Sequence, residues 1–220
     1  MTIEEVVRQI HHVGIVPVLR ASSADDACRA VEVICEAGIP IVEITMTVPH
    51  ATTVIREVVR RYGDTVLAGA GTVVDAEQAS ACLDAGAEFL VSPGVSVPVI
   101  HLARSRKKLA IPGALTPTEI MALTEHGINL VKIFPCSSVG GPKHISSLRA
   151  PFPKLDFIPT GGVNASNAEE YLRAGAFALG VGADLADIHS IRAGQAHKVA
   201  SAAQALKVAV AKVREAQGDR

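Results

Sequence analysis

The stretch Asn129-Leu130-Val131-Lys132-Ile133-Phe134-Pro135 has the composition of a buried β-strand with one residue out of place. It is apolar, partly β-branched and ended by a proline, which is typical of a strand in a protein core. Lysine is rarely buried without a partner, and burial favours its uncharged amine. An uncharged amine is the nucleophile that forms Schiff bases with carbonyl substrates. The alternative is an edge strand from which Lys132 reaches solvent.

Around this stretch the chain repeats one unit, a short apolar segment followed by a helical one. After a helix expected over 2–12, eight strands are expected over 14–20, 39–47, 65–70, 88–92, 109–112, 129–134, 156–160 and 177–181, with helical sequence from there to the C-terminus. Eight such units predict a (β/α)8 TIM barrel with an extra N-terminal helix, as a single domain over 1–220. A doubly wound sheet is the alternative, but Arg20-Ala21-Ser22 stands where its Gly-rich fingerprint would follow the first strand.

Composition excludes several classes of function. Hydrophobic residues make up 49% of the chain and the formal net charge is −1, so no basic surface for nucleic acid is expected. Aromatic residues make up only 3%, which argues against base stacking. The four cysteines lack metal-ligand spacing. The acidic start Met1–Glu5 has no apolar signal core and no run approaches a membrane span, so a cytoplasmic protein is expected.

Glu43 is the second charged residue in an apolar strand, within Ile41-Val42-Glu43-Ile44-Thr45. A desolvated carboxylate is suited to general acid/base work. Strand periodicity places Glu43, Thr45 and Thr47 on one face. If that face and the face of Lys132 both point inward, the pair forms the machinery of a class I aldolase, which needs neither a metal nor a cofactor. The alternative is a structural ion pair inside the barrel.

Glycine-rich turns close the last two predicted strands, as Thr160-Gly161-Gly162 and Gly180-Val181-Gly182. Turns after strands seven and eight are the usual phosphate-binding loops of barrel enzymes. Arg20 ends the neighbouring first strand and could bind a phosphate or carboxylate. The alternative for Arg20 is a surface salt bridge to Asp25 or Asp26.

Seven segments carry a family resemblance in their order and spacing: Val16–Arg20, Val42–Pro49, Gly69–Val73, Ser92–Gly94, Ile111–Gly113, Val131–Pro135 and Pro159–Val163. The chain resembles the 2-keto-3-deoxy-6-phosphogluconate (KDPG) aldolases, which also act as 4-hydroxy-2-oxoglutarate (KHG) aldolases. The resemblance implies a homotrimer that binds a 2-keto acid and pyruvate, with Lys132 as Schiff-base lysine and Glu43 as acid/base. It implies substrate contacts by Arg20, Thr47, Thr72, Pro93, Phe134, Gly161, Gly162 and Gly182.

Two positions depart from the family pattern. Some members carry an arginine where this chain has Thr47, while other members share the threonine. A family serine after strand eight, which helps hold phosphate, is Ala183 here and is followed by Asp184. A missing hydroxyl and an added carboxylate should weaken phosphate binding. KDPG is therefore the first expected substrate, with KHG or an unphosphorylated sugar acid as alternatives. An isomerase or epimerase of phosphorylated sugars, and a non-catalytic phosphate-binding barrel, are the alternatives from other classes.

Overall fold

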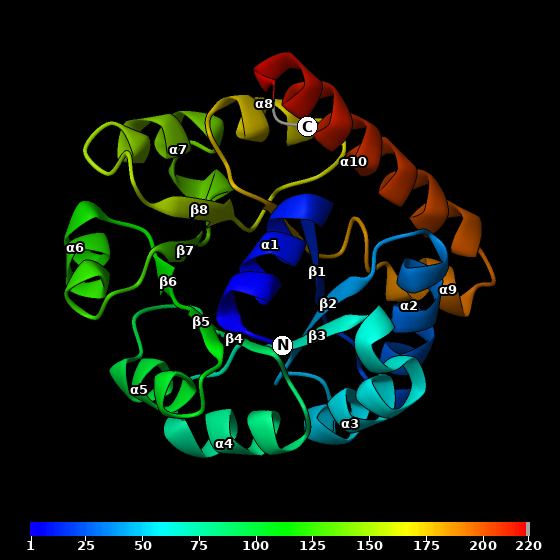
Figure 1. The fold of residues 1–220 in the computed structure, drawn as a ribbon. Helices are drawn as coiled ribbons and strands as arrows, with labels where there is room; N and C mark the ends of the chain where they lie inside the picture. The colour runs from blue at the N-terminus through cyan, green and yellow to red at the C-terminus, as the bar shows by residue number, and fades with distance from the viewer. Residues whose placement is uncertain (219–220) are drawn as a thin grey trace.

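The computed structural model describes residues 1–218 and has parallel strands alternating with helices (Figure 1). The α-helices are α1 Ile3–Val13, α2 Ala24–Glu36, α3 Ala51–Tyr62, α4 Ala76–Asp84, α5 Val97–Ser105, α6 Pro117–Glu125, α7 Pro142–Arg149, α8 Ala168–Arg173, α9 Ile188–Arg192 and α10 Ala196–Gln217, and the 3-10 helices are η1 Gly63–Thr65 and η2 Ser137–Val139. The strands are β1 Ile15–Leu19, β2 Ile41–Thr45, β3 Leu67–Gly71, β4 Phe89–Val91, β5 Leu109–Ile111, β6 Gly113–Ala114, β7 Leu130–Ile133, β8 Asp156–Pro159 and β9 Leu179–Val181.

Within residues 1–218 the strands form two parallel sheets, a six-stranded half-barrel β5-β4-β3-β2-β1-β9 and a three-stranded sheet β6-β7-β8. The prediction of an α/β fold with parallel strands is confirmed. The predicted fifth strand is interrupted at Pro112, which has no N–H to donate, although its carbonyl accepts a hydrogen bond from Lys132 N at 3.0 Å. At the β8 edge of the three-stranded sheet, an isolated bridge joins Thr160 to Gly180 of β9.

Several helices begin where the sequence provides a side chain to cap them. Thr2 and Thr116 each form a capping box, with Glu5 and Glu119 at the third helical position. Ser23 and Asp75 cap α2 and α4 through their side chains alone, each accepting a hydrogen bond from a backbone N–H of the first turn. Each cap satisfies a donor that the helix itself leaves unpaired, so these boundaries follow directly from local sequence.

The interior of the sheets is filled by one apolar layer near the N-terminal ends of the strands. Ile41 and Leu130 belong to this layer, with Val6 and Ile10 of α1 packed against it. Figure 1 shows α1 lying across this end of the sheets. Because side chains of a strand alternate, Glu43 and Lys132 face the same interior one step nearer the C-terminal ends. The apolar layer is therefore the floor on which the two charged side chains lie.

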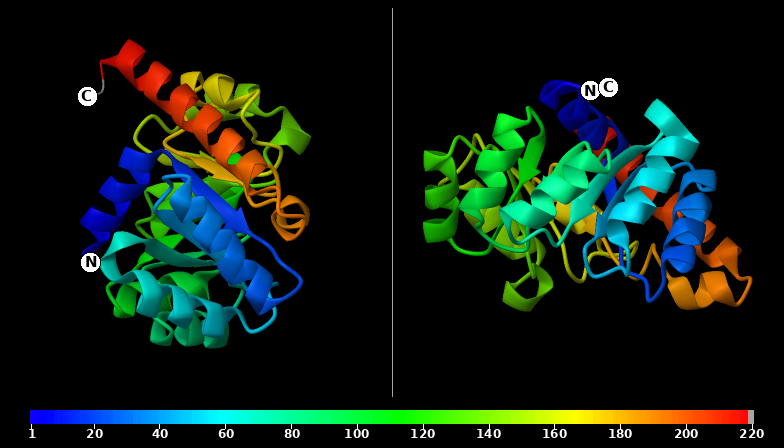
Figure 2. Two further views of the ribbon diagram at one scale, coloured as in Figure 1. Left: turned by 90° about the vertical axis from the view of Figure 1, so that its right-hand side faces the viewer. Right: turned by 90° about the horizontal axis from the view of Figure 1, so that it is seen from below.

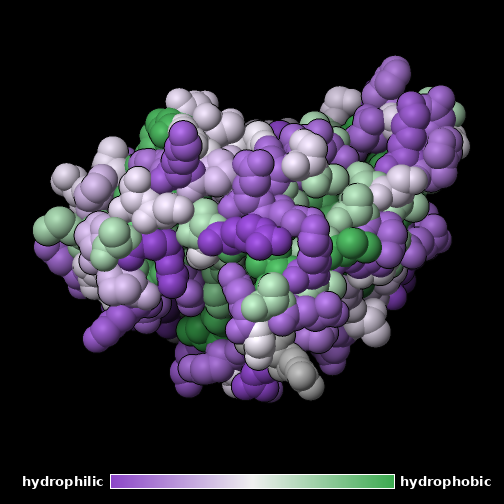
Figure 3. Space-filling model, turned by 90° about the horizontal axis from the view of Figure 1, so that it is seen from above, coloured by the Kyte–Doolittle hydropathy of each residue, from purple (hydrophilic) through white to green (hydrophobic). Residues whose placement is uncertain are grey.

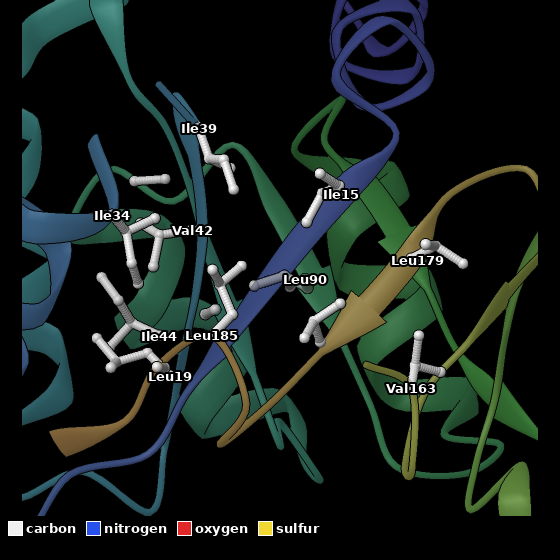
Figure 4. Packing of buried hydrophobic residues seen from close by; sticks show 14 of the residues in the cluster. Ile15, Leu19, Ile34, Ile39, Val42, Ile44, Leu90, Val163, Leu179 and Leu185 are labelled. Atoms are coloured by element: carbon white, nitrogen blue, oxygen red, sulfur yellow. The ribbon is translucent and has the colours of Figure 1, made fainter. Parts of the chain in front are cut away.

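The opposite faces of the strands pack against the surrounding helices. Val42 and Ile44 of β2 lie beside Ile34 of α2, and Leu19 of β1 joins the same cluster (Figure 4). All four side chains are fully buried. Burial of each such side chain contributes about 1.5–3 kcal/mol. This outer layer fixes β1 and β2 against α2, and with them the residues at the ends of those strands.

The C-terminal helical stretch is two helices, α9 and α10, separated at Gly194-Gln195. Figure 2 shows α9 at the end of the sheets opposite to α1, and α10 running along the side of the molecule. Lys207 Nζ donates to the Ala37 carbonyl at 2.7 Å, and Arg214 Nη1 donates to the His12 carbonyl at 2.6 Å. The face over α10 and α8 is mostly hydrophilic, with small hydrophobic patches (Figure 3). Helix α10 thus holds the C-terminal ends of α1 and α2 in place by hydrogen bonds to their last carbonyl groups.

None of the helices within residues 1–218 has the length and apolar character needed to span a membrane.

Candidate active site

Lys132 and Glu43 meet in the interior, just beyond the apolar floor. Lys132 is the third residue of β7 and Glu43 the third residue of β2. Lys132 Nζ donates to Glu43 Oε1 at 3.4 Å, and the two residues are only 4% and 3% exposed. Both side chains point into the interior, which is the condition that the class I aldolase interpretation requires. The structure excludes the alternative in which Lys132 lies on an edge strand and reaches solvent.

Gly71, the last residue of β3, makes room for the Glu43 carboxylate. A Cβ atom at this position would fall well inside van der Waals contact of Glu43 Oε1, Cδ and Cγ. Below it, a Cβ at Gly69 would collide in the same way with the Phe89 ring. The two glycines let β3 lie close behind Glu43 and Phe89, so the carboxylate is directed toward Lys132.

We expect Gly71→Ala to lower kcat by about 10²-fold, since a displacement of about 1 Å of a reacting group can have that effect. The added methyl group must push the Glu43 carboxylate away from Lys132 Nζ. The control is Gly94→Ala, because a Cβ there meets no heavy atom within 4 Å. Steady-state kinetics of both variants test the expectation. Equal activity of Gly71→Ala and the wild type would show that the position of Glu43 is not critical.

Phe134 packs above the lysine and against the loop that follows β8. Its ring centroid lies 5.4 Å from Lys132 Nζ, within cation–π range. A Cβ at Gly161 would be 3.4 Å from Phe134 Cδ2. Three of the predicted site residues, Lys132, Phe134 and Gly161, are therefore neighbours. The aromatic ring provides an apolar wall for a planar group bound to the amine.

Thr72 and Pro93 follow β3 and β4, the two strands that come after β2 in the order of the half-barrel. Thr72 comes directly after Gly71, is half-buried and has a backbone φ of 57°. Ser92 Oγ donates to the Gly94 carbonyl at 2.7 Å, which fixes the turn around Pro93. The Pro93 carbonyl lies against Gly113, and Gly113 is the partner of Lys132 in the β6–β7 register. Both residues thus lie on the side of the interior that adjoins the Lys132–Glu43 pair.

The turn after β8 contains two successive glycines in the left-handed region of the backbone. Gly161 and Gly162 both have positive φ, 90° and 77°, which glycine adopts without strain. Ser137 lies directly against Gly162, where an added Cβ would collide with its hydroxyl oxygen, and Ser137 N donates to the Gly161 carbonyl at 3.2 Å. Ser137 could not be recognised from the sequence, since nothing in its neighbours distinguishes it from an ordinary loop serine.

Arg20 and Thr47 form a separate group at the exposed ends of β1 and β2. Arg20 Nη1 donates to Thr47 Oγ1 at 3.5 Å, and Thr47 Oγ1 is 2.7 Å from Thr45 Oγ1. The alternative of a salt bridge from Arg20 to Asp25 or Asp26 is wrong, because Arg20 forms no ion pair within residues 1–218. Asp26 is bound instead by Arg192 of α9 in a bidentate pair. The hydrogen bond from Arg192 holds the pKa of Asp26 well below its usual range.

Gly182 follows β9, which pairs with β1, so it lies near the end of the strand that carries Arg20. The space around it is open, since a Cβ there would meet no heavy atom within 4 Å. Ala183 and Asp184 come next and are exposed, and the Gly182 carbonyl accepts hydrogen bonds from Leu185 N and Ala186 N. The Asp184 carboxylate forms no ion pair with another residue in the described part of the chain.

Cys136, four residues after Lys132 in the sequence, is not activated as a nucleophile. Burial raises the pKa of the Cys136 thiol to about 11, so it stays protonated near neutral pH. Within residues 1–218 no three His, Cys, Asp or Glu side chains are grouped to hold a metal ion. A cavity of about 520 Å³ lies at the opposite end of the strands, between α1 and β5, and is lined by apolar side chains such as Ile3 and Phe177 and by charged ones such as Arg8 and Lys108. It contains neither Lys132 nor Glu43 and is separate from this site.

Comparison with known proteins shows which family the chain belongs to. The family model "KDPG and KHG aldolase" matches residues 3–202. A 2-dehydro-3-deoxy-phosphogluconate aldolase of Treponema pallidum is 33% identical over 195 residues, 89% of this chain and 92% of the relative. A 2-dehydro-3-deoxy-6-phosphogalactonate aldolase of Escherichia coli is 35% identical over 182 residues, 82% and 86% of the two chains.

A solved structure is similar over nearly the same extent. It is a KDPG aldolase from Legionella pneumophila with pyruvate captured at low pH as a covalent carbinolamine intermediate. It aligns with a TM-score of 0.84 at 27% identity, and the match covers 91% of this chain and 97% of that one. The chain therefore belongs to the KDPG and KHG aldolase family of carbon–carbon lyases.

Proposed function

We propose that Lys132 is the Schiff-base lysine of a class I aldolase and that Glu43 is its acid/base. The observation that carries this proposal is the buried contact of 3.4 Å between Lys132 Nζ and Glu43 Oε1. A buried ion pair is a poor way to stabilise a fold, since apolar residues of similar size often do as well or better. An amine next to a carboxylate in a water-poor interior is, in contrast, a suitable arrangement for carbonyl chemistry.

The chemistry follows from these two groups. The Lys132 ammonium first gives a proton to Glu43, and the free amine attacks C2 of a 2-keto-4-hydroxy acid. Glu43 then returns the proton to the hydroxyl of the carbinolamine, which leaves as water and gives an iminium ion. Glu43 then accepts the proton of the C4 hydroxyl while the C3–C4 bond breaks, and the bonding electrons move into the iminium. The aldehyde leaves, the remaining enamine is protonated at C3, and water releases pyruvate and the free amine. Glu43 supplies the proton to C3, and the cycle needs no oxidant or reductant because cleavage leaves the overall oxidation state unchanged.

The first substrate that we propose is KDPG, which this reaction splits into pyruvate and glyceraldehyde 3-phosphate. Thr72 and Pro93 would line the pyruvate half and Phe134 would pack beside the imine. Arg20, held by Thr47, and the turns at Gly161, Gly162 and Gly182 would hold the far end. The 2-dehydro-3-deoxy-6-phosphogalactonate isomer is a second candidate because the relative named for it is 35% identical. KHG is a third, because Ala183 and Asp184 depart from the family's phosphate site.

The finer architecture is part of the same proposal. We propose that the two sheets close into one (β/α)8 barrel, with β5 and β6 as one strand broken at Pro112 and β8 next to β9. The Thr160–Gly180 bridge supports this, as does the hydrogen bond from Phe177 N to the Phe157 carbonyl at 2.9 Å. A homotrimer is proposed from the family resemblance, a single domain from the unbroken run of strand–helix units, and a cytoplasmic location from the composition of the sequence. Light scattering in solution tests the trimer.

The test of the mechanism is covalent trapping. Incubation with pyruvate followed by borohydride should give a stable adduct, and peptide mass mapping should find it only on Lys132. The same treatment without pyruvate is the control for non-specific reduction. An unmodified protein, in a preparation that is folded, would remove the Schiff-base mechanism and favour a phosphosugar isomerase or epimerase in which Lys132 acts only through its charge.

The far end of the substrate is tested by Ala183→Ser. The hydroxyl should add a hydrogen bond to a phosphate and lower KM for KDPG by roughly tenfold, the effect of one such bond to a charged group. Plain 2-keto-3-deoxygluconate should show no change, because it has no phosphate to accept the bond. Steady-state kinetics on both substrates give the comparison. A wild-type enzyme that prefers the plain acid or KHG would overturn KDPG as first choice.

A further inference from the structure

A chain of hydroxyl groups connects the backbone of β1 to the guanidinium of Arg20. Thr45 is fully buried and its Oγ1 lies 2.8 Å from the Leu19 carbonyl oxygen. A carbonyl can only accept, so the single hydroxyl proton of Thr45 is used there. At the 2.7 Å contact between the two threonines, Thr47 must therefore be the donor. The contacts thus have one direction, from Thr47 to Thr45 to Leu19.

This direction determines what Thr47 can offer to a third group. Its proton is used toward Thr45, so its oxygen presents only lone pairs on the remaining side. An oxygen of that kind accepts from a cation and cannot donate to a phosphate or carboxylate. Thr47 Oγ1 accepts a hydrogen bond from Arg20 Nη1 at 3.5 Å. Thr47 is accordingly placed to hold the arginine rather than to bind an anion itself.

Arg20 has a charge that no described side chain neutralises. It is exposed at the end of β1, and its hydrogen bond to Thr47 is its one polar side-chain contact within residues 1–218. Asp26, the nearest candidate in sequence with a buried carboxylate, is bound by Arg192 instead. A guanidinium has five N–H donors, so one bond to Thr47 leaves a fork free for an anion.

We propose that Thr45 is a positioning residue, which acts through Thr47 to hold Arg20 toward the anionic far end of the substrate. This inference rests on the proposed aldolase function. It explains why position 45 carries a threonine, although Thr45 is not proposed to contact the substrate. Thr45 lies on the same face of β2 as Glu43, two residues closer to the exposed end. Its β-branched side chain has restricted χ1 freedom, which keeps the hydroxyl on the Leu19 carbonyl.

The first experiment compares Thr45→Val with Thr45→Ser. Valine keeps the shape and removes the hydroxyl, whereas serine keeps the hydroxyl. With KDPG as substrate, Thr45→Val should raise KM roughly threefold to tenfold, the effect of one lost hydrogen bond, with a smaller change in kcat. Thr45→Ser should restore most of the loss. With unphosphorylated 2-keto-3-deoxygluconate, Thr45→Val should leave KM within about twofold, because Arg20 has no distal anion to bind.

The second experiment is a double-mutant cycle with Arg20→Met, which separates positioning from a structural role. In the Arg20→Met background, Thr45→Val should add almost nothing to KM for KDPG. An equal penalty in both backgrounds, or equal losses on the two substrates, would overturn the proposal and assign Thr45 to stability alone. Thermal unfolding of every variant shows whether each is folded.

Pyruvate trapping tests the aldolase mechanism separately from the positioning role of Thr45. Wild type and Thr45→Val should both form the borohydride-reduced adduct, since Lys132 and Glu43 are unchanged. If the wild type forms no adduct, the aldolase mechanism fails. If the wild type forms the adduct but Thr45→Val has the wild-type KM for KDPG, the mechanism stands and the positioning role of Thr45 is refuted.

Discussion

Replacement of Lys132 by methionine is expected to abolish the pyruvate adduct and to lower kcat/KM for aldol cleavage by roughly 10⁴-fold or more. Without the amine no iminium can form, and the electrons of the C3–C4 bond have no acceptor. Intact-mass measurement after borohydride reduction and a coupled assay for pyruvate release give the two readouts. Residual cleavage within about tenfold of the wild type would show that the reaction proceeds without a covalent intermediate.

A folding control is needed because Lys132→Met leaves the Glu43 carboxylate buried without its partner. Removal of one member of a buried ion pair can destabilise a protein by about 3–5 kcal/mol. The double variant Lys132→Met with Glu43→Gln removes both charges together. We expect it to unfold at a temperature close to that of the wild type and to be inactive. Inactivity of a variant with wild-type stability can then be assigned to chemistry.

Glu43→Gln is expected to lower kcat by about 10²–10⁴-fold, the range found when a positioned general acid/base is removed. Glutamine has nearly the same shape and can still accept a hydrogen bond from Lys132 Nζ, but it cannot take up a proton. The pyruvate adduct should therefore form, slowly, while cleavage and exchange of the pyruvate methyl protons with deuterated water almost stop. Rapid trapping and proton NMR of pyruvate measure the two steps.

The matched control is Glu88→Gln, which removes another lysine–glutamate pair far from this site. Glu88 Oε2 accepts from Lys108 Nζ at 2.6 Å, with both side chains 25% exposed. Its loss should leave kcat unchanged, because a partly exposed pair contributes little beyond about 1 kcal/mol of stability. Comparable losses in Glu88→Gln and Glu43→Gln would point to destabilisation, and an unaltered kcat in Glu43→Gln would make Glu43 structural.

The central pair could be predicted because its signal is local and periodic. Lys132 and Glu43 each interrupt an apolar strand, and the twofold alternation of a strand decides which face they share. The α/β class follows from the same regularity, since each apolar segment is followed by a helical one. Helix starts at Thr2 and Thr116 are also local, because the capping residue and its glutamate lie three positions apart.

The features that could not be predicted depend on distant parts of the chain. Arg192 binds Asp26 across most of the sequence, and no local pattern links the two. The role of Gly71 depends on how closely β3 approaches Glu43, which only the packed sheet determines. The interruption of the strand at Pro112 depends on which hydrogen-bond acceptor of the neighbouring strand lies opposite the N–H that proline lacks. The contact of Thr45 with Leu19 likewise requires the register of β1 against β2.

The pairing of β1 with β9 has a consequence for synthesis of the chain. Ile15 pairs with Leu179 and Pro17 with Val181, so one edge of the first strand stays uncovered until the last strand leaves the ribosome. Contacts of such long sequence separation form slowly, and unpaired strand edges promote aggregation. The nascent protein therefore emerges with an unpaired edge on its first strand, and this edge is covered only when β9 has been synthesised.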